Sequence, residues 1–452
     1  MVESKEEAER DAVNSCRVVK GGRVVMDRGK ALVGLGNWVQ GLRCLPWLAV
    51  NFFLKDTLHV HPSTLQLLQN SVNLPMVAKP LYGVISDAVY IRGQHRIPYI
   101  IVGVLLQAVS WLSIAVLPPA SVSIFTVTFL LLLSNLGASV VEVANDALVA
   151  EFDKRPNTTK KPQQSSSGEL QSFVLMCASI GGVMGNLIGG ISIDKLSSQT
   201  LFFAFGLLLL IQLLATITID ENSLNLPKAT FNSGIKTQMS DLIVALKKPE
   251  IAYSLAWLAS SYAVVPFLPG TMFFYQTQFL KLDSSILGIS KVFGQAALLL
   301  WSVVYNKRLK SISPRKLVCA IQIAVFLFMV SDALFVKRMY LNIGISDSVY
   351  VVIISGLLEV LVLFKVLPYS VLLAQLCPKG CEGSLMAFLM STVALAGIIS
   401  GCLGVALASF VGISGNDFSG LPQGILIQAG FALLPLFWSS WIPSYTKSSK
   451  ED

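Results

Sequence analysis

QTLFFAFGLLLLIQLLATITI, residues 199–219, is a run of 21 residues without one charged side chain. A helix of about 20 apolar residues crosses the hydrocarbon core of a bilayer. The run ends at a polar stretch, residues 220–250, that carries acidic and basic side chains. Comparable apolar runs recur on both sides of this stretch, six before it and six after it. The sequence therefore predicts an all-α protein that crosses a lipid bilayer many times.

Twelve transmembrane spans follow from these runs. Only 13% of the 452 residues are charged, whereas a soluble domain carries about 25%. Six spans form a predicted bundle over 31–219 and six a second bundle over 251–442, with a central loop, 220–250, and tails, 1–30 and 443–452. The spans are Ala31–Leu54, Leu65–Asp87, Ile97–Leu117, Val122–Val149, Leu170–Ile193, Gln199–Ile219, Ile251–Phe279, Ile286–Val304, Leu317–Val336, Val349–Gln375, Ser384–Gly412 and Gly424–Ile442.

The basic residues predict the orientation. With both termini in the cytoplasm, about 25 Lys and Arg residues fall in cytoplasmic tails and loops and about 5 on the opposite side, as expected when positive charge stays inside. The net charge of +8 therefore indicates no nucleic-acid partner. The acidic start, MVESKEEAERD, has no apolar core, so we expect no cleavable presequence. Which membrane holds the protein is left open.

Motifs for enzymatic chemistry are missing from the sequence. It has no GxxxxGK[ST], GxSxG or HExxH pattern, and its seven cysteines form no CxxC pair. Three histidines, His59, His61 and His95, are too few and too separated to predict a metal site. We therefore expect neither an enzyme nor an ATP-driven pump, with no catalytic residue, no metal and no cofactor.

The two halves repeat one pattern. The fifth span contains Gly181, Gly185 and Gly189, and the eleventh, six helices later, contains Gly397 and Gly401. Small residues at this spacing allow helices to approach closely, and ordinary helix packing accounts for most of these glycines. The joints after the second and eighth spans are both basic. Two six-helix bundles with matched joints indicate the major facilitator fold, and we expect a monomer.

Charged side chains inside spans are costly, so each needs an explanation. Arg43 and Lys79 lie in the first and second spans, and Glu359 lies in the tenth. Glu142 and Asp146 lie four residues apart on the fourth span, so both project from one face. One reading is a polar cavity for an anionic solute, with acids that exchange a proton. The other is internal ion pairing that locks the helices together.

On the first reading, both sets of residues serve transport. The predicted substrate-binding residues are Gln40, Arg43, Trp47, Lys79 and Asn145, and the predicted proton-coupling residues are Glu142, Asp146 and Glu359. A flat solute would stack on Trp47, although membrane tryptophans also serve as interfacial anchors. Lys79 and Asp87 approach the cytoplasmic joint, which favours a structural or gating role for them. Lys291 and Asp332 lie near helix ends, which predicts snorkelling to the interface.

Stretches spread over most of the chain resemble, in order, the folate–biopterin transporter family, a branch of the major facilitator superfamily. The resemblance implies a gating loop motif that comprises Gly83, Asp87, Arg92 and Arg96. The stretches that carry it are Gln40-Gly41-Leu42-Arg43, Leu54-Lys55-Asp56, Lys79-Pro80-Leu81-Tyr82-Gly83, Ser86-Asp87, Asn145-Asp146-Ala147, Gly344-Ile345-Ser346-Asp347, Leu376-Cys377-Pro378, Glu382-Gly383 and Leu389-Met390-Ser391.

Two stretches depart from that family's pattern. Met76-Val77-Ala78 stands where the family has a Trp before its Lys-Pro, and Gln94-His95-Arg96 stands where it has Tyr-Arg-Arg. The resemblance implies a secondary transporter of folates or pterins that works by alternating access and is driven by protons. Two alternatives stay open: a carrier for another small organic anion, and a membrane sensor or scaffold of the same fold that transports nothing.

Overall fold

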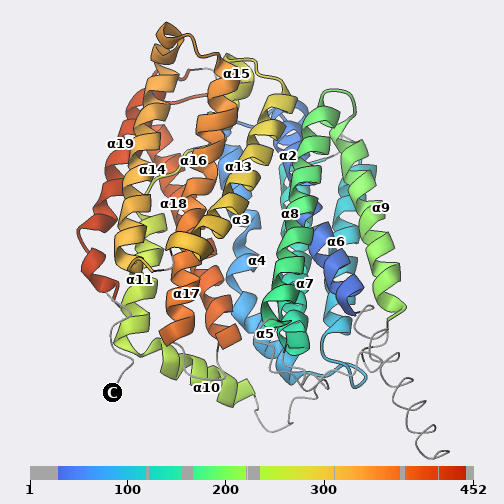
Figure 1. The fold of residues 1–452 in the computed structure, drawn as a ribbon. Helices are drawn as coiled ribbons and strands as arrows, with labels where there is room; N and C mark the ends of the chain where they lie inside the picture. Colours follow the sequence, from blue (N-terminus) through green and yellow to red (C-terminus); the bar gives the residue numbers. More distant parts are fainter. Residues whose placement is uncertain are drawn as a thin grey trace, which may run out of the picture.

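The computed structural model describes residues 29–118, 122–153, 166–219, 221, 235–309, 311–376, 382–415 and 417–443. The predicted tails lie almost wholly outside these ranges, as does much of the central loop. Over the described residues the chain is helical, and the helices run side by side in one bundle (Figure 1). The bundle agrees with the predicted all-α class.

Eight helices in the described part of the chain are long and apolar enough to cross a membrane. Each overlaps one of the predicted spans, and several extend beyond it by a few residues. The first, second, seventh and twelfth predicted spans instead hold interrupted or shorter helices. The eight are Ile97–Val116, Ile124–Phe152, Ser172–Ile193, Ser198–Ile217, Ser284–Leu309, Pro314–Val336, Asp347–Leu373 and Ser384–Phe410.

The first half of the chain forms its helices in the predicted order. Residues 29–42, α2 and η1 make the first span, and α3, α4 and α5 make the second. Single helices make the next four. The bounds are α2 Cys44–Phe52, η1 Phe53–Thr57, α3 Pro62–Val72, α4 Leu74–Val77, α5 Lys79–Ala88, α6 Ile97–Val116, α7 Ile124–Asp153, α8 Ser166–Ile193 and α9 Ser198–Ile217.

The second half begins with α10, which lies at the lower end of the bundle in Figure 1 and packs against α5 and α11. The bounds are α10 Ile235–Leu246, α11 Pro249–Ala263, α12 Pro269–Phe274, η4 Tyr275–Phe279, α13 Ser284–Val304, η5 Tyr305–Leu309, α14 Pro314–Val336, η6 Met339–Ile343, α15 Asp347–Tyr350, η7 Val351–Ser355, α16 Gly356–Leu361, η8 Val362–Lys365, α17 Val366–Leu376, α18 Glu382–Phe410, α19 Leu421–Leu433, η9 Leu434–Leu436 and η10 Ser439–Trp441.

Prolines explain where the helices break, because proline has no N–H and cannot close the helical hydrogen bond. Pro266 and Pro269 follow the end of α11, and the irregular segment 264–268 separates α11 from α12. The backbone groups set free are satisfied from other helices. Ser400 Oγ donates to the Val265 carbonyl at 2.5 Å, and Gln66 Nε2 donates to the Phe267 carbonyl at 2.8 Å. Broken helices within a membrane need such internal partners.

The second span breaks in the same way at Pro75 and Pro80, between α3, α4 and α5. Asn135 Nδ2 on α7 donates to the Val72 carbonyl at 2.7 Å, and the Ser391 hydroxyl on α18 donates to the Val77 carbonyl. The break is therefore held by one helix from each half.

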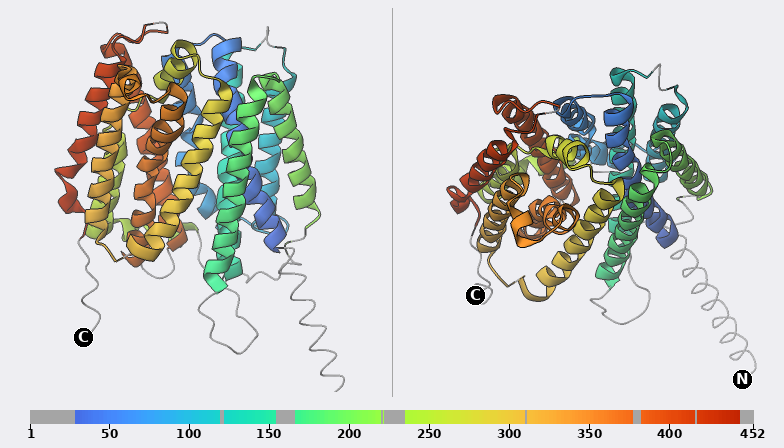
Figure 2. Two further views of the ribbon diagram at one scale, coloured as in Figure 1. Left: turned by 45° about the horizontal axis from the view of Figure 1, so that its top comes forward. Right: turned by 90° about the horizontal axis from the view of Figure 1, so that it is seen from above.

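The two halves meet where α8 and the second span contact helices of the second half, and α12 also packs against α3. α8 packs against α13, and α18 packs against α3, α4 and α5. The view from above in Figure 2 shows the earlier helices, blue to green, on one side and the later helices, yellow to red, on the other. Such an arrangement leaves a space between the halves wherever the facing helices do not touch.

Glycines bring the first span close to α8. A Cβ at Gly181 would lie 2.2 Å from the Trp38 carbonyl oxygen, and one at Gly41 would lie 2.1 Å from the Ala178 carbonyl oxygen. No side chain fits at those distances, so the two helix backbones touch directly. The small-residue spacing in the fifth span is thus explained by packing, as predicted.

Candidate functional site

A cavity of about 290 Å³ lies between the two halves. The first half contributes the α2 residue Leu48 and the α3 residue Gln69, and α12, α13, α14, α16 and α19 of the second half complete the wall. Concave sites at the interface of two bundles are where small ligands bind. The cavity is therefore the candidate solute site.

Among the described residues, the charged side chains that line the cavity come from the second half. Lys291 Nζ on α13 pairs with Glu359 Oε1 on α16 at 2.6 Å. Asp332 on α14 is 6% exposed and lies in the same wall. The snorkelling predicted for Lys291 and Asp332 is therefore wrong, because Lys291 has a carboxylate partner and Asp332 is buried. Glu359 lies in the wall of this candidate cavity, and its proton-coupling role stays a prediction.

The charged residues of the first half form a separate cluster. Arg43 Nη1 lies 2.9 Å from Glu142 Oε1, and Lys79 Nζ lies 2.5 Å from Glu142 Oε2. Arg43 Nη2 also donates to Asn135 Oδ1 at 2.7 Å. This is the internal ion pairing left open by the sequence, and it ties the first, second and fourth spans together beside the break between α3 and α4.

Three of the predicted binding residues nevertheless keep buried nitrogens without a hydrogen-bond partner among the described residues: Gln40 Nε2, Arg43 Nε and Asn145 Nδ2. Buried donors are normally satisfied, so each could serve an acceptor group of a solute. Asp146 is exposed and has no ion pair within the described residues. Trp47 packs edge-on against Trp111 at 6.2 Å, within the first half and outside the cavity wall.

Lys365 in the second half is a buried cation that lies outside the cavity wall. Its Nζ donates to Ser261 Oγ at 3.1 Å and to Gln322 Oε1 at 3.0 Å, and it lies 4.1 Å from the centre of the Tyr262 ring. Since its partners are neutral groups on α11 and α14, its role in this conformation is to join helices of the second half.

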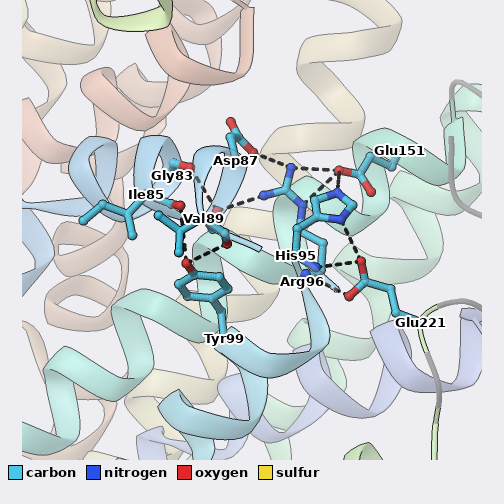
Figure 3. Close-up of polar contacts among 10 residues, drawn as sticks. Gly83, Ile85, Asp87, Val89, His95, Arg96, Tyr99, Glu151 and Glu221 are labelled. Carbon is cyan, nitrogen blue, oxygen red and sulfur yellow. Dashed lines mark hydrogen bonds and ion pairs between the residues drawn. The ribbon is translucent and has the colours of Figure 1, made fainter. Parts of the chain in front are cut away.

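The predicted loop motif lies in a compact polar cluster at the cytoplasmic end assigned by the sequence (Figure 3). Arg96 Nη2 pairs with Asp87 Oδ1 at 2.5 Å and with Glu151 Oε1 at 2.8 Å. Its Nη1 donates to Ser86 Oγ at 2.8 Å. Arg96 thereby joins the end of α5 to the end of α7. Within the predicted motif, Asp87 and Arg96 are in direct contact.

The other two motif residues lie beside this cluster. Arg92 is exposed and has a positive φ of 53°, followed by Gly93 with a φ of 79°. These angles close a tight turn in which Ile91 and Gln94 exchange backbone hydrogen bonds. A Cβ at Gly83 would meet Val143 at an ordinary 3.5 Å, so α5 and α7 pack closely there.

Two residues complete the cluster without having been singled out by the motif. The Glu221 carboxylate accepts the backbone N–H groups of His95, Arg96 and Ile97 at 2.9–3.0 Å, which satisfies the start of α6. His95 Nδ1 lies 2.7 Å from Glu221 Oε1, and His95 Nε2 lies 3.1 Å from Glu151 Oε1. The imidazole is therefore held between two carboxylates, and Figure 3 shows it in that position.

This arrangement determines the charge of the His95 ring and of the Glu221 carboxyl group. Burial of the ring opposes its protonated form, but the hydrogen bonds to Glu151 and Glu221 outweigh burial and raise the pKa of His95 to about 9. Burial likewise opposes the ionised form of Glu221, yet the His95 ring and the three backbone N–H groups lower the pKa of Glu221 to about 2. His95 is an imidazolium and Glu221 a carboxylate near neutral pH.

Sequence reasoning overlooked Lys291, Asp332, His95 and Glu221 as functional candidates. For Lys291 and Asp332 the signal was available, since both are charged residues within apolar runs. For Glu221 nothing in the local sequence indicates that its carboxylate returns to residues 95–97.

The sequence profile of the BT1 family matches residues 40–452. The chain is 60% identical to "Probable folate-biopterin transporter 7" of Arabidopsis thaliana over 412 residues, 91% of this chain and 92% of that protein. It is 44% identical to "Probable folate-biopterin transporter 9, chloroplastic" of the same plant, over 94% of this chain and 79% of that protein. A crystal structure of the nucleoside transporter NupG matches with a TM-score of 0.69 at 15% identity, over 92% of this chain and 99% of NupG. The last likeness shows the major facilitator fold.

Proposed function

The chain belongs to the BT1 family and is a multi-pass membrane transporter rather than an enzyme, and we propose that it carries folates or pterins by proton-coupled alternating access. The observation that supports this most is the cavity between the halves, which holds the Lys291–Glu359 pair and Asp332. Charged groups at the interface of two bundles mark a solute pathway in a membrane protein. The solute class, folates and pterins, is taken from the names of the similar proteins, which are called probable folate-biopterin transporters.

Alternating access requires that contacts between the halves can break and re-form. Gln66 on α3 donates to the carbonyls of Phe267 and Gly401 at 2.8 and 2.7 Å and accepts from the Gly270 N–H at 3.1 Å. Ser284 Oγ on α13 donates to the Gly190 carbonyl on α8 at 2.6 Å. In each of these contacts one side chain is hydrogen-bonded to main-chain groups of the other half. A rocking motion of the halves can therefore break these hydrogen bonds and let the side chains bond to other main-chain groups.

Proton coupling is assigned in this proposal to Asp146 in the first half. Glu142 already faces two cations, so adding a proton to it would leave both without an anionic partner among the described residues. Glu359 is likewise paired with Lys291. Asp146 carries no such partner in the described residues. Of the three acids predicted from the sequence, Asp146 therefore needs the least rearrangement to gain and lose a proton.

Purified protein in vesicles tests the proposal directly. Uptake of labelled folate, pterin and unrelated organic anions is measured with and without an inward proton gradient. We expect saturable uptake of a folate or a pterin that increases with the gradient. A matched pair of variants controls for leakage: Met272→Trp fills the cavity, whereas Met176→Trp places the same side chain on the exposed face of α8, where Met176 is 52% exposed.

The outcomes separate the three candidate functions. Folate or pterin uptake that Met272→Trp abolishes and Met176→Trp preserves supports the proposal. Uptake of a different anion with the same variant pattern indicates a carrier for that anion. Absence of uptake for every solute, with folded protein in the vesicles, leaves the sensor or scaffold as the function.

A further inference from the structure

Asp332 is the cavity residue whose charge has no partner. Its Oδ1 accepts hydrogen bonds from the Tyr350 hydroxyl at 3.2 Å and the Ser355 hydroxyl at 3.5 Å. No hydrogen bond from the described residues reaches Oδ2, and none of their ion pairs includes Asp332. The residue is 6% exposed and lies in the cavity wall. Oδ2 is thus left for whatever occupies the cavity, and so is the second acceptor site of Oδ1, where the Ser355 hydroxyl lies at the limiting distance of 3.5 Å.

The neighbouring groups cannot supply the missing donor. Lys291 is bonded to Glu359 at 2.6 Å, and the Tyr350 hydroxyl already bridges Ser331 and Asp332. With Lys291 and Glu359 paired, Asp332 is the acid of the cavity wall that has no cationic partner among the described residues. A buried carboxylate needs donors, because its desolvation is otherwise unfavourable. This side of the cavity therefore suits a group of the solute that donates hydrogen bonds rather than a solute carboxylate.

Some heteroaromatic rings carry two adjacent N–H donors that fit the two oxygens of a carboxylate. The two oxygens accept two parallel N–H bonds, as they do from a guanidinium. A 2-amino-4-oxopyrimidine edge, which pterins carry, offers a ring N–H and an exocyclic amino group side by side in the same spacing. The cavity volume of about 290 Å³ is close to the lower end of the roughly 300–1,000 Å³ of small-molecule sites, enough for a two-ring heterocycle. The side-chain amides of Gln276 and Gln428 lie in the same wall and offer donors and acceptors for hydrogen bonds to the ring heteroatoms of the solute.

We propose that Asp332 determines specificity by accepting the ring N–H and the 2-amino group of an aminopteridine, and that the ring lies in the cavity with this edge against α14. The inference rests on the proposed function, because it assumes a pterin-containing solute. It adds which edge of the solute is recognised and by which residue. An acidic tail on the solute would then point away from Asp332.

Two pteridines that differ at one position test the inference. The first is 2-amino-4-oxopteridine and the second is 2,4-dioxopteridine, in which an oxygen acceptor replaces the amino donor. Binding is followed by quenching of pteridine fluorescence with purified protein in detergent, at a pH where both compounds are neutral. We expect the wild type to bind the amino compound about tenfold more tightly, because the dioxo compound places an acceptor where the carboxylate needs a donor.

Asp332→Asn should abolish or reverse this preference. An asparagine presents one acceptor and one donor, which complement the ring N–H and the 2-oxygen of the dioxo compound. Asp347→Asn is the matched control. Asp347 lies outside the cavity wall and pairs with Arg338 at 3.0 Å, so this variant should keep the wild-type preference. Ser355→Ala, which removes one donor to Oδ1 and leaves the carboxylate, should also keep it.

The possible results bear differently on the two proposals. A preference for the amino compound that persists in Asp332→Asn overturns the role of Asp332, as does equal binding of both compounds by the wild type. If the wild type takes up folate in vesicles without distinguishing the pteridines, the transport proposal stands and this inference falls. If it neither binds nor transports any pteridine or folate, both fall. Should Asp332→Asn fail to fold, the Ser355→Ala and wild-type binding ratios still decide, because equal binding in either refutes the inference.

Discussion

The cluster around His95 predicts a stability that depends on pH, and replacing the ring by an uncharged side chain should reveal it. His95→Gln keeps a polar group at the position but removes the positive charge between Glu151 and Glu221. The pKa of His95 rises from 6.5 to about 9 in the folded protein. At about 1.4 kcal/mol per pH unit, this corresponds to about 3 kcal/mol of stabilisation at most.

The sign follows from the direction of the shift. Because the folded protein binds the His95 proton more tightly than the unfolded chain, the stabilisation is complete below pH 6.5. It decreases as the pH rises and is lost above pH 9. The carboxylate of Glu221, with a pKa of about 2, stays charged throughout this range. The difference in unfolding free energy between wild type and His95→Gln should therefore be largest near pH 6 and small near pH 10.

Unfolding of the purified protein by SDS in mixed micelles measures this difference at each pH. Taking the difference between two proteins removes the titration of groups that both share. His61→Gln is the control, since His61 is exposed and makes no side-chain hydrogen bond or ion pair with another described residue. A difference for His95→Gln that is constant between pH 6 and pH 10, or that grows with pH, refutes the reasoning. The result would mean that the ring is held as a neutral group.

Three further predictions concern transport and orientation. Arg43→Lys, in protein that inserts normally, should lose most uptake, because a lysine cannot replace the planar guanidinium that bonds Glu142 and Asn135 with its two Nη groups; full-rate uptake would reduce Arg43 to charge balance for Glu142. Asp146→Asn should abolish proton-driven accumulation and preserve solute exchange, measured as uptake and counterflow on one preparation; accumulation that still follows pH would remove Asp146 from the mechanism. Cysteines introduced at Thr230 and Ser448, in a background without other reactive thiols, should resist impermeant thiol reagents in intact cells, and labelling of both would reverse the predicted orientation.

The site shows where sequence reasoning reached its limit. Arg43, Glu142 and Lys79 were recognised as charges within spans, and the structure brings all three together. Whether they bind a solute or one another was open in the sequence, because both readings need the same residue types at the same depth. Lys291 and Glu359 lie 68 positions apart, and only the packing of α13 on α16 makes them partners.

The cluster around Arg96 shows the same limit. The resemblance to the folate–biopterin transporter family indicated Gly83, Asp87, Arg92 and Arg96 as a loop motif, and the structure brings Asp87 and Arg96 into contact. The contact of Glu221 with residues 95–97 joins positions about 125 apart. No local pattern specifies that contact, since it depends on α9 ending beside the start of α6.

By itself, the sequence determined the class of this protein and the positions of its long apolar helices. Those features follow from composition and run length, because a bilayer admits only helices whose backbone is satisfied internally. The tertiary structure decided which charges are neutralised and which remain for a solute. Arg43 and Lys79 share Glu142, Lys291 has Glu359, and Asp332 has only hydroxyl donors. The physical reason is that the cost of a buried charge depends on what lies within a few ångströms of it, and helices distant in sequence supply those neighbours.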